Sequence, residues 1–188
     1  MSRLNRLVLI ASILPLSWFG MQAVHEFGHV LGAWLTGGKV AKIVLHPLTI
    51  SYTTFSANPH PLPTVWAGPA GGIFLPLAAL CCAAALRLQG AYLLRFFTGF
   101  CLVANGAYIG IGSFGRIGDA GVMLQNGAAI WQLWAFGALT VPLGFWLWHG
   151  QGKYFGLGKT PNEVRPVAAY SVCALLFLTL AFELALGR

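Results

Sequence analysis

Five apolar segments, each close to or above the length needed to cross a lipid bilayer, make up most of this chain. They cover approximately residues 4–36, 64–86, 91–112, 128–149 and 167–186. A membrane-spanning helix needs about 20 consecutive apolar residues, and inside hydrocarbon its backbone has to satisfy its own hydrogen bonds. The sequence therefore predicts an all-α, polytopic membrane protein with five to six transmembrane helices.

The composition agrees with this prediction. Hydrophobic residues make up 57% of the chain and charged residues only 8%, whereas a soluble domain carries about 25% charged residues. The net charge of +7 comes mostly from basic residues at segment ends, where flanks meet lipid headgroups. No basic run with interleaved aromatic residues is present, so the expected partners include the lipid bilayer but no nucleic acid.

The segments differ in what they predict locally. As one helix, residues 4–36 would be roughly 45–50 Å long, so Pro15 or Gly20 could kink the segment or divide it into two crossings. Residues 39–57 are rich in β-branched and aromatic types and predict a small β-hairpin. The proline-rich stretch 58–63 predicts a loop that no helix enters, and the glycine-rich stretch 113–127 predicts a re-entrant segment. We expect residues 1–188 to form a single integral-membrane domain.

One motif in the first segment carries a specific chemistry. His25, Glu26 and His29 form an H-E-x-x-H pattern. On a helix, positions i and i+4 share a face, so both imidazoles can reach one Zn²⁺ while the glutamate serves as a base toward water. Ionisable residues in an apolar, membrane-length segment are costly, which favours a functional role for all three.

A hydrolytic zinc site usually takes a third protein ligand and leaves one position open. Counting crossings places Asp119, in the glycine-rich stretch, on the same side of the membrane as the end of the motif helix. Glu183, in the last apolar segment, is the main alternative. Four further residues are weaker candidates because they lie in surface loops or at segment ends: His46, His60, His149 and Glu163.

The order of these features resembles that of site-2 proteases, the intramembrane zinc metalloproteases of peptidase family M50, and in particular small M50B-like members. After H-E-x-x-H come Gly37-Gly38, the hairpin, Ala67-Gly68-Pro69 and Gly118-Asp119-Ala120. The resemblance covers about residues 20–125. It implies that His25, His29 and Asp119 bind zinc and that Glu26 is the catalytic base.

The resemblance implies an intramembrane zinc metalloendopeptidase that cleaves membrane proteins in or next to a transmembrane helix. Asn105, a lone amide in the third segment, could bind the substrate backbone or form a hydrogen bond between helices. The expected location is the cytoplasmic membrane of a bacterium. Two alternatives remain at this stage: a catalytically inactive M50-like scaffold that only binds partners, and a metal carrier that uses the same three ligands.

The membrane orientation stays open at the level of sequence. With five crossings and the N-terminal end inside, seven basic residues lie inside and four outside, which puts the hairpin outside. The family resembled has its active site nearer the cytosol. Dividing the first segment into two crossings restores that placement but leaves six basic residues against five.

Overall fold

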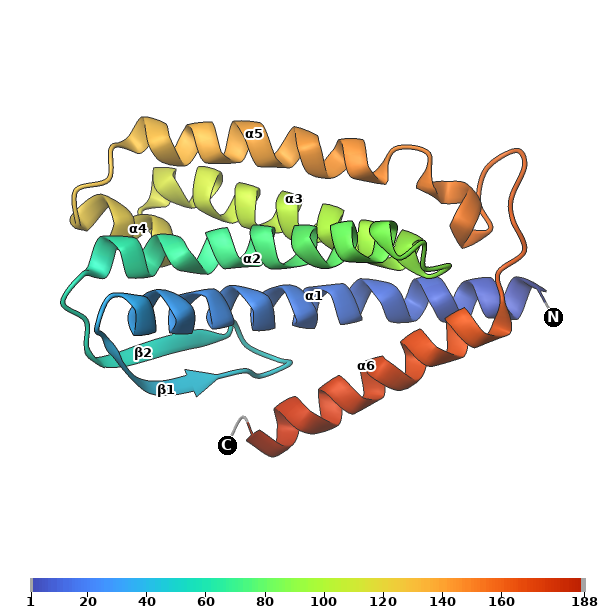
Figure 1. Ribbon diagram of the computed structural model, residues 1–188, viewed down its shortest axis with the longest axis horizontal. Coiled ribbons are helices and arrows are strands. Elements are labelled where there is room, and N and C mark those ends of the chain that lie inside the picture. The colour runs from blue at the N-terminus through green and yellow to red at the C-terminus, as the bar shows by residue number, and fades with distance from the viewer. Residues whose placement is uncertain (1, 187–188) are drawn as a thin grey trace.

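The computed structural model describes residues 2–186, and it is mostly helical (Figure 1). The long helices are α1 (Ser2–Leu35), α2 (Pro61–Ala85), α3 (Ala91–Gly115), α5 (Ile130–Trp148) and α6 (Pro166–Leu186). The shorter elements are strands β1 (Lys39–Val44) and β2 (Tyr52–Ala57), helix α4 (Gly118–Gln125) and the 3₁₀ helix η1 (Gln151–Phe155). The predicted helical class and the hairpin after the first helix are both confirmed.

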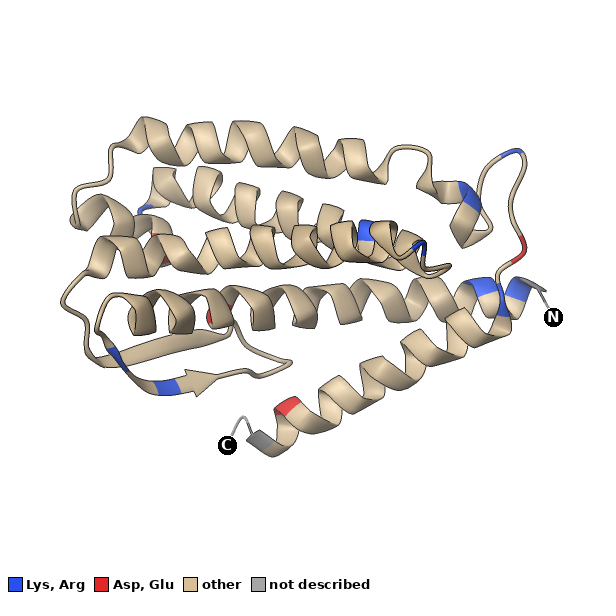
Figure 2. Cartoon of the chain, in the orientation of Figure 1, with Lys and Arg blue, Asp and Glu red and all other residues tan. Residues whose placement is uncertain are grey.

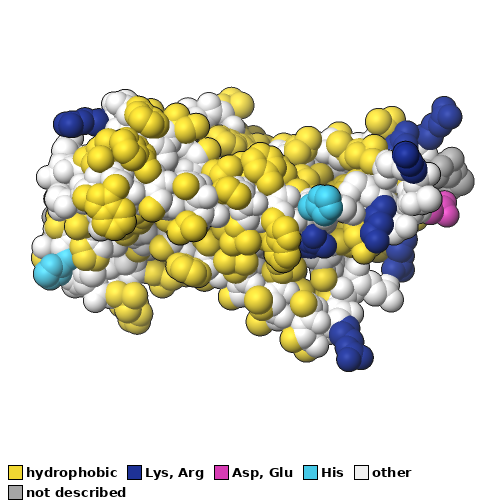
Figure 3. Space-filling view, turned by 90° about the horizontal axis from the view of Figure 1, so that it is seen from above, with side chains coloured by type: hydrophobic (Ala, Val, Ile, Leu, Met, Phe, Trp, Pro, Cys, Tyr) yellow, Lys and Arg dark blue, Asp and Glu magenta, His cyan; other side chains and the backbone are white. Residues whose placement is uncertain are grey.

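Within the described residues, five helices are long and apolar enough to cross a membrane: α1, α2, α3, α5 and α6. Large apolar side chains are exposed along them, for example Phe74 at 69%, Leu139 at 73% and Phe177 at 64%. The face seen in Figure 3 is covered mainly by hydrophobic side chains. An exterior of this kind suits lipid and not water, and the chain is accordingly a multi-pass membrane protein.

Helix α1 is a single helix of 34 residues that continues through Pro15. At 1.5 Å per residue it is about 51 Å long. The division into two crossings, which its length alone would allow, does not occur. This fixes the number of crossings between the start of α1 and the hairpin at one.

Helix α2 begins at Pro61, inside the stretch predicted as a loop that no helix enters, so that prediction is wrong. Pro61 and Pro63 both lie in the first helical turn. The first backbone N–H groups of a helix have no partner within it, and a proline there gives up nothing. Only prolines after the first turn cost the helix a hydrogen bond.

The helices form a layered bundle in which α1 packs against α2 and α6, α2 against α3, and α3 against α5. Helix α4 does not cross the bundle; it packs on α3 and α2 at the end where the hairpin lies (Figure 1). The two strands pair antiparallel, with Val44 opposite Tyr52 and Ile43 opposite Thr53. The hairpin, α4 and the C-terminal third of α1 therefore meet at one end of the molecule.

Candidate metal centre

Three side chains from two helices converge near this end of the bundle. His25 and His29, one turn apart on α1, are buried, and their Nε2 atoms lie 3.2 Å from each other. The Asp119 Oδ2 atom of α4 lies 2.8 Å from Nε2 of His25 and 3.2 Å from Nε2 of His29. Among residues 2–186 this is the group of histidine, cysteine and acidic side chains that could hold a metal ion.

Each histidine has its other ring nitrogen engaged. The Nδ1 atom of His29 donates to the backbone carbonyl of Thr64 at 3.0 Å. The Nδ1 atom of His25 lies 2.6 Å from Oδ1 of Asn105, and the Asn105 amide nitrogen donates to the carbonyl of Cys101 at 2.9 Å. Since a carbonyl can only accept, these contacts fix both tautomers as Nδ1–H and leave both Nε2 lone pairs free.

This donor set fits a zinc ion. Two imidazole nitrogens and a carboxylate oxygen that point at one another repel unless a cation or protons lie between them. For zinc bonds of about 2.0–2.1 Å in tetrahedral geometry, ligand atoms lie about 3.3 Å apart, close to the three distances observed here. Hydrogen bonds from the remote ring nitrogens are the usual way in which a protein orients histidine ligands.

Packing of α4 brings Asp119 to the histidines. Ala120 and Met123 lie about one turn apart on α4. Both are fully buried in a cluster with Ile109 of α3. The Asp119 backbone N–H donates to the Tyr108 hydroxyl at 3.1 Å. The α4 helix is therefore held by an apolar face and one polar contact, which leaves the carboxylate directed toward α1.

The Asp119 carboxylate is ionised at neutral pH. Burial on its own raises the pKa of this carboxyl, but the close contacts of its oxygen with His25 and His29 lower the pKa and outweigh burial. The pKa of Asp119 consequently lies well below its usual range. A metal ligand has to be deprotonated, and Asp119 meets this requirement.

Glu26 lies beside the group and is held by the hairpin. Its side chain is only 5% exposed, and its Oε2 atom accepts a hydrogen bond of 2.7 Å from the Thr53 hydroxyl of β2. One turn earlier on α1, Oε1 of Gln22 accepts the backbone N–H of Ser51 at 2.8 Å. The hairpin is thus tied to the same face of α1 that carries the motif.

A cavity of about 740 Å³ opens next to these residues and gives Glu26, His25, His29 and Asp119 a shared space. Its wall is mostly apolar and comes from α1, the hairpin and the loop within it, the first turns of α2, α3 and the start of α4. The larger apolar side chains in that wall are Trp18, Met21, Tyr52, Phe55, Ile117 and Val122. An extended polypeptide with apolar side chains would suit such a wall.

The small residues of α2 allow it to approach α1 at the motif. A Cβ atom on Gly28 would lie 2.2 Å from the Ala67 carbonyl oxygen, and one on Gly68 would lie 2.3 Å from the His29 ring. A Cβ on Gly72 would lie 2.7 Å from the Asn105 amide. The Ala-Gly-Pro-Ala-Gly-Gly stretch thus leaves the space that the His29 ring and the Asn105 amide occupy.

The other candidate ligands lie elsewhere. Glu183 is buried on α6, and its Oε2 atom has no hydrogen-bond partner among the described residues, but it is not part of the converging group. Nδ1 of His46 accepts the backbone N–H of Leu48 within its own turn. His60 precedes α2 and His149 follows α5, while Glu163 is exposed in the loop before α6.

Several contributors to the site could not be singled out from the sequence. Thr53 donates to Glu26, and the Tyr108 hydroxyl accepts from the backbone of Asp119. Thr64 contributes its backbone carbonyl, a group that every residue has and that leaves no signal in the sequence. The sequence predicts for Asn105 either substrate binding or a hydrogen bond between helices, and the contact with His25 of α1 confirms the second. Both ends of its amide are engaged, with His25 and Cys101, and a role in substrate binding stays a prediction.

Comparison with known proteins adds one finding. A family model described as Peptidase M50B-like matches residues 6–110, more than half of the 188 residues. The matched stretch holds the H-E-x-x-H motif, the hairpin, the glycines of α2 and Asn105, and it ends before Asp119. No curated protein and no solved structure matches the chain. From the family match over most of its helical core, the chain belongs to the Peptidase M50B-like family.

Proposed function

We propose that this protein is an intramembrane zinc metalloendopeptidase that hydrolyses peptide bonds in or next to transmembrane segments of membrane proteins, in the cytoplasmic membrane of a bacterium. One observation carries the proposal: Nε2 of His25, Nε2 of His29 and Oδ2 of Asp119 converge, and the Glu26 carboxylate lines the same cavity. His25, His29 and Asp119 would hold the zinc ion. When bound, zinc supplies a Lewis acid that polarises a carbonyl oxygen and lowers the pKa of water.

Side chains of the protein carry out the proton transfers of the reaction. Glu26 accepts a proton from the attacking water as the water oxygen bonds to the scissile carbonyl carbon. Glu26 then passes this proton to the amide nitrogen as the carbon–nitrogen bond breaks. Thr53 keeps the carboxylate in place during both transfers, because its hydroxyl donates to Oε2.

Burial of Glu26 favours hydrolysis over metal transport. A buried, ionisable side chain in a membrane-spanning helix is costly. A carrier with three ligands gains nothing from a second acidic group that faces the same cavity. A hydrolase needs a base at that place. The hairpin, tied to α1 through Thr53, would hold an unwound substrate segment beside this base.

The test is to trap substrate with Glu26→Gln. The glutamine amide keeps an oxygen that can accept from Thr53, so the protein should retain its fold and its metal. It cannot act as a base, and the rate should fall by about 10²–10⁴-fold or more. Membrane proteins that copurify with the variant should be intact, whereas wild type should yield fragments cut in or beside a transmembrane helix.

Glu163→Gln, at an exposed glutamate in the loop before α6, is the matched control and should cleave like wild type. If zinc-loaded wild type and Glu26→Gln retain the same uncut partners in several detergents and in lipid, the proteolytic function is refuted. The scaffold alternative would then account for the site.

A further inference from the structure

The hydroxyl group of Tyr108 has a hydrogen that no neighbouring acceptor uses. Tyr108 lies on α3 and is one of the residues that line the cavity. Its oxygen accepts the backbone N–H of Asp119 at 3.1 Å. A phenol can accept and donate at the same time, and among residues 2–186 no group accepts the hydrogen of this one. The O–H is therefore available to a molecule that enters the cavity.

Contacts on two sides hold this hydroxyl beside the candidate metal ligands. The Tyr108 ring packs edge-on against the His25 ring, with the ring centroids 5.9 Å apart and the planes at 71°. Its hydroxyl meets the first turn of α4 at Gly118, where an added Cβ atom would collide with the hydroxyl oxygen. Because position 118 has no side chain, the hydroxyl can occupy this space. It thus lies between α1 and α4, the two helices that carry the three ligands.

Three other polar side chains of the cavity wall are engaged elsewhere. The Thr53 hydroxyl donates to Glu26, and the side-chain oxygen of Gln22 accepts a backbone N–H from the loop of the hairpin. The Asn105 amide uses its oxygen for a histidine ligand and its nitrogen for a carbonyl of α3. Tyr108 differs from them because it combines an unused hydrogen with direct contact to two of the residues that carry the ligands.

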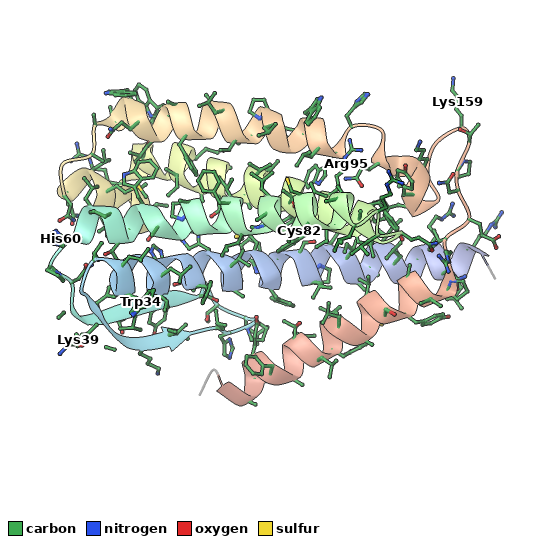
Figure 4. All side chains as sticks on the ribbon, viewed as in Figure 1. Trp34, Lys39, His60, Cys82, Arg95 and Lys159 are labelled. Carbon is green, nitrogen blue, oxygen red and sulfur yellow. The ribbon has the colours of Figure 1, made fainter. Side chains whose placement is uncertain are left out.

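The charges of the cavity indicate which kind of group needs such a donor. Figure 2 shows acidic positions on α1 and at α4, toward the end of the bundle that Trp34 and His60 mark in Figure 4. They are Glu26 and Asp119, and among the described residues no Lys or Arg lines the cavity. When water attacks a peptide bond, negative charge develops on the carbonyl oxygen, and fixed hydrogen-bond donors stabilise this charge. Besides a metal ion, a neutral donor has to serve this purpose here.

We infer that Tyr108 is a catalytic residue whose O–H donates a hydrogen bond to the carbonyl oxygen of the scissile peptide bond. The inference rests on the proposed function. As the water oxygen bonds to the carbonyl carbon, the π electron pair of the carbonyl moves to its oxygen, and the Tyr108 hydroxyl stabilises the resulting charge. Tyr108 keeps its proton throughout, since Glu26 carries out both proton transfers. The N–H of Asp119 holds the phenol oxygen in place and, by polarising the hydroxyl, strengthens it as a donor.

The experiment compares zinc-loaded wild type with Tyr108→Phe, which removes the hydroxyl and keeps the ring that packs on His25. The probes are two short peptides of leucine and alanine with the same sequence. In one, a phosphinate replaces the central amide and carries a negative oxygen where the charge develops in the reaction. In the other the amide is intact, and this peptide is titrated in the Glu26→Gln background, where it is not cleaved. Tyr170→Phe, at a half-exposed tyrosine of α6, is the matched control.

Tyr108→Phe should bind the phosphinate peptide about 10²–10³-fold more weakly than wild type, the usual effect of removing one donor to such an oxygen. The kcat value should fall by a similar factor. The KM value and the affinity for the intact peptide should change little, because the hydrogen bond strengthens only as charge develops. Tyr170→Phe should match wild type in every measurement. Equal affinity of Tyr108→Phe and wild type for the phosphinate peptide overturns the inference.

A second variant separates donation to the substrate from positioning of Asp119. Tyr108→4-methoxyphenylalanine keeps an oxygen that can accept the Asp119 N–H but has no hydrogen to donate. It should therefore lose affinity for the phosphinate peptide as Tyr108→Phe does, and both variants should keep the zinc content of wild type. Recovered phosphinate affinity in the methoxy variant, or loss of zinc from Tyr108→Phe, would make Tyr108 a positioning residue for Asp119 and overturn the inference.

The inference and the proposed function fail in different ways. If wild type cleaves its partners and Tyr108→Phe matches it in both kcat and phosphinate affinity, the inference alone fails. If zinc-loaded wild type neither cleaves its partners nor prefers the phosphinate peptide over the intact one, the proposed function fails and the inference fails with it.

Discussion

His25 and His29 are each held at one ring nitrogen so that the other nitrogen faces the cavity. The two partners differ in kind, because Thr64 offers a backbone carbonyl and Asn105 offers a side-chain amide. Only the second contact can be removed by substitution without changing the chain's backbone. A substitution of Asn105 therefore removes a contact that orients His25 and leaves all three candidate metal ligands in place.

At the residue scale, Asn105→Ala should weaken zinc binding by about 10- to 100-fold, the usual effect of removing a partner that orients a histidine ligand. The physical reason is that His25 loses the acceptor for its Nδ1–H and can rotate or change tautomer. The measurement is competition for zinc against a chelator of known affinity. Asn126→Ala, at an exposed amide that bonds only to the Val122 carbonyl, is the control.

An Asn105→Ala protein with unchanged zinc affinity but a raised KM for substrate would point instead to the substrate role that the sequence suggested. The two roles are therefore separable by one variant. A loss of both properties would indicate that Asn105 serves His25 and the substrate together.

At the element scale, the feature that shapes the site is the close approach of α1 and α2. Backbone meets backbone at Gly28 and Ala67, and the His29 ring fills the space above Gly68. Interiors this dense do not accept an added methyl group without a shift of neighbouring atoms. The position of His29 thus depends on a residue of another helix that has no side chain.

The corresponding prediction is that Gly68→Ala displaces the His29 ring or separates the helices. Overpacking of this kind costs about 1–3 kcal/mol, and zinc occupancy should fall even though every ligand is present. Gly90→Ala adds a methyl group in open space and should leave stability and zinc unchanged. Thermal unfolding in detergent and zinc content after dialysis measure the two effects; full zinc occupancy in Gly68→Ala would contradict the packing argument.

At the scale of the whole molecule, the sequence predicted the features that depend on the length of the apolar segments and on the period of a helix. Apolar length marked the five spans, and the four-residue spacing of His25 and His29 matched one helical turn. The start of α2 at Pro61 was missed, because a proline tolerated in a first turn looks the same in sequence as one that ends a helix. Thr53 and Thr64 were missed because their roles arise from packing between elements distant along the chain.

The continuity of α1 likewise could not be decided from the sequence. Pro15 and the excess length both allowed a break, but the packing of α1 against α2 and α6 supports one continuous helix. This single fact leaves one crossing between the start of α1 and the hairpin. The topology of the whole molecule therefore depends on α1, whose sequence alone allowed either one or two membrane crossings.

The central claim is that His25, His29 and Asp119 hold one zinc ion, and metal analysis of the purified protein tests it most directly. Wild type and Glu183→Gln should each carry about one zinc per chain. His25→Ala, His29→Ala and Asp119→Ala should carry far less, with unchanged elution on size exclusion as evidence of folding. Stoichiometric zinc in the His25→Ala/His29→Ala double variant, or loss of zinc in Glu183→Gln but not in Asp119→Ala, would contradict the account.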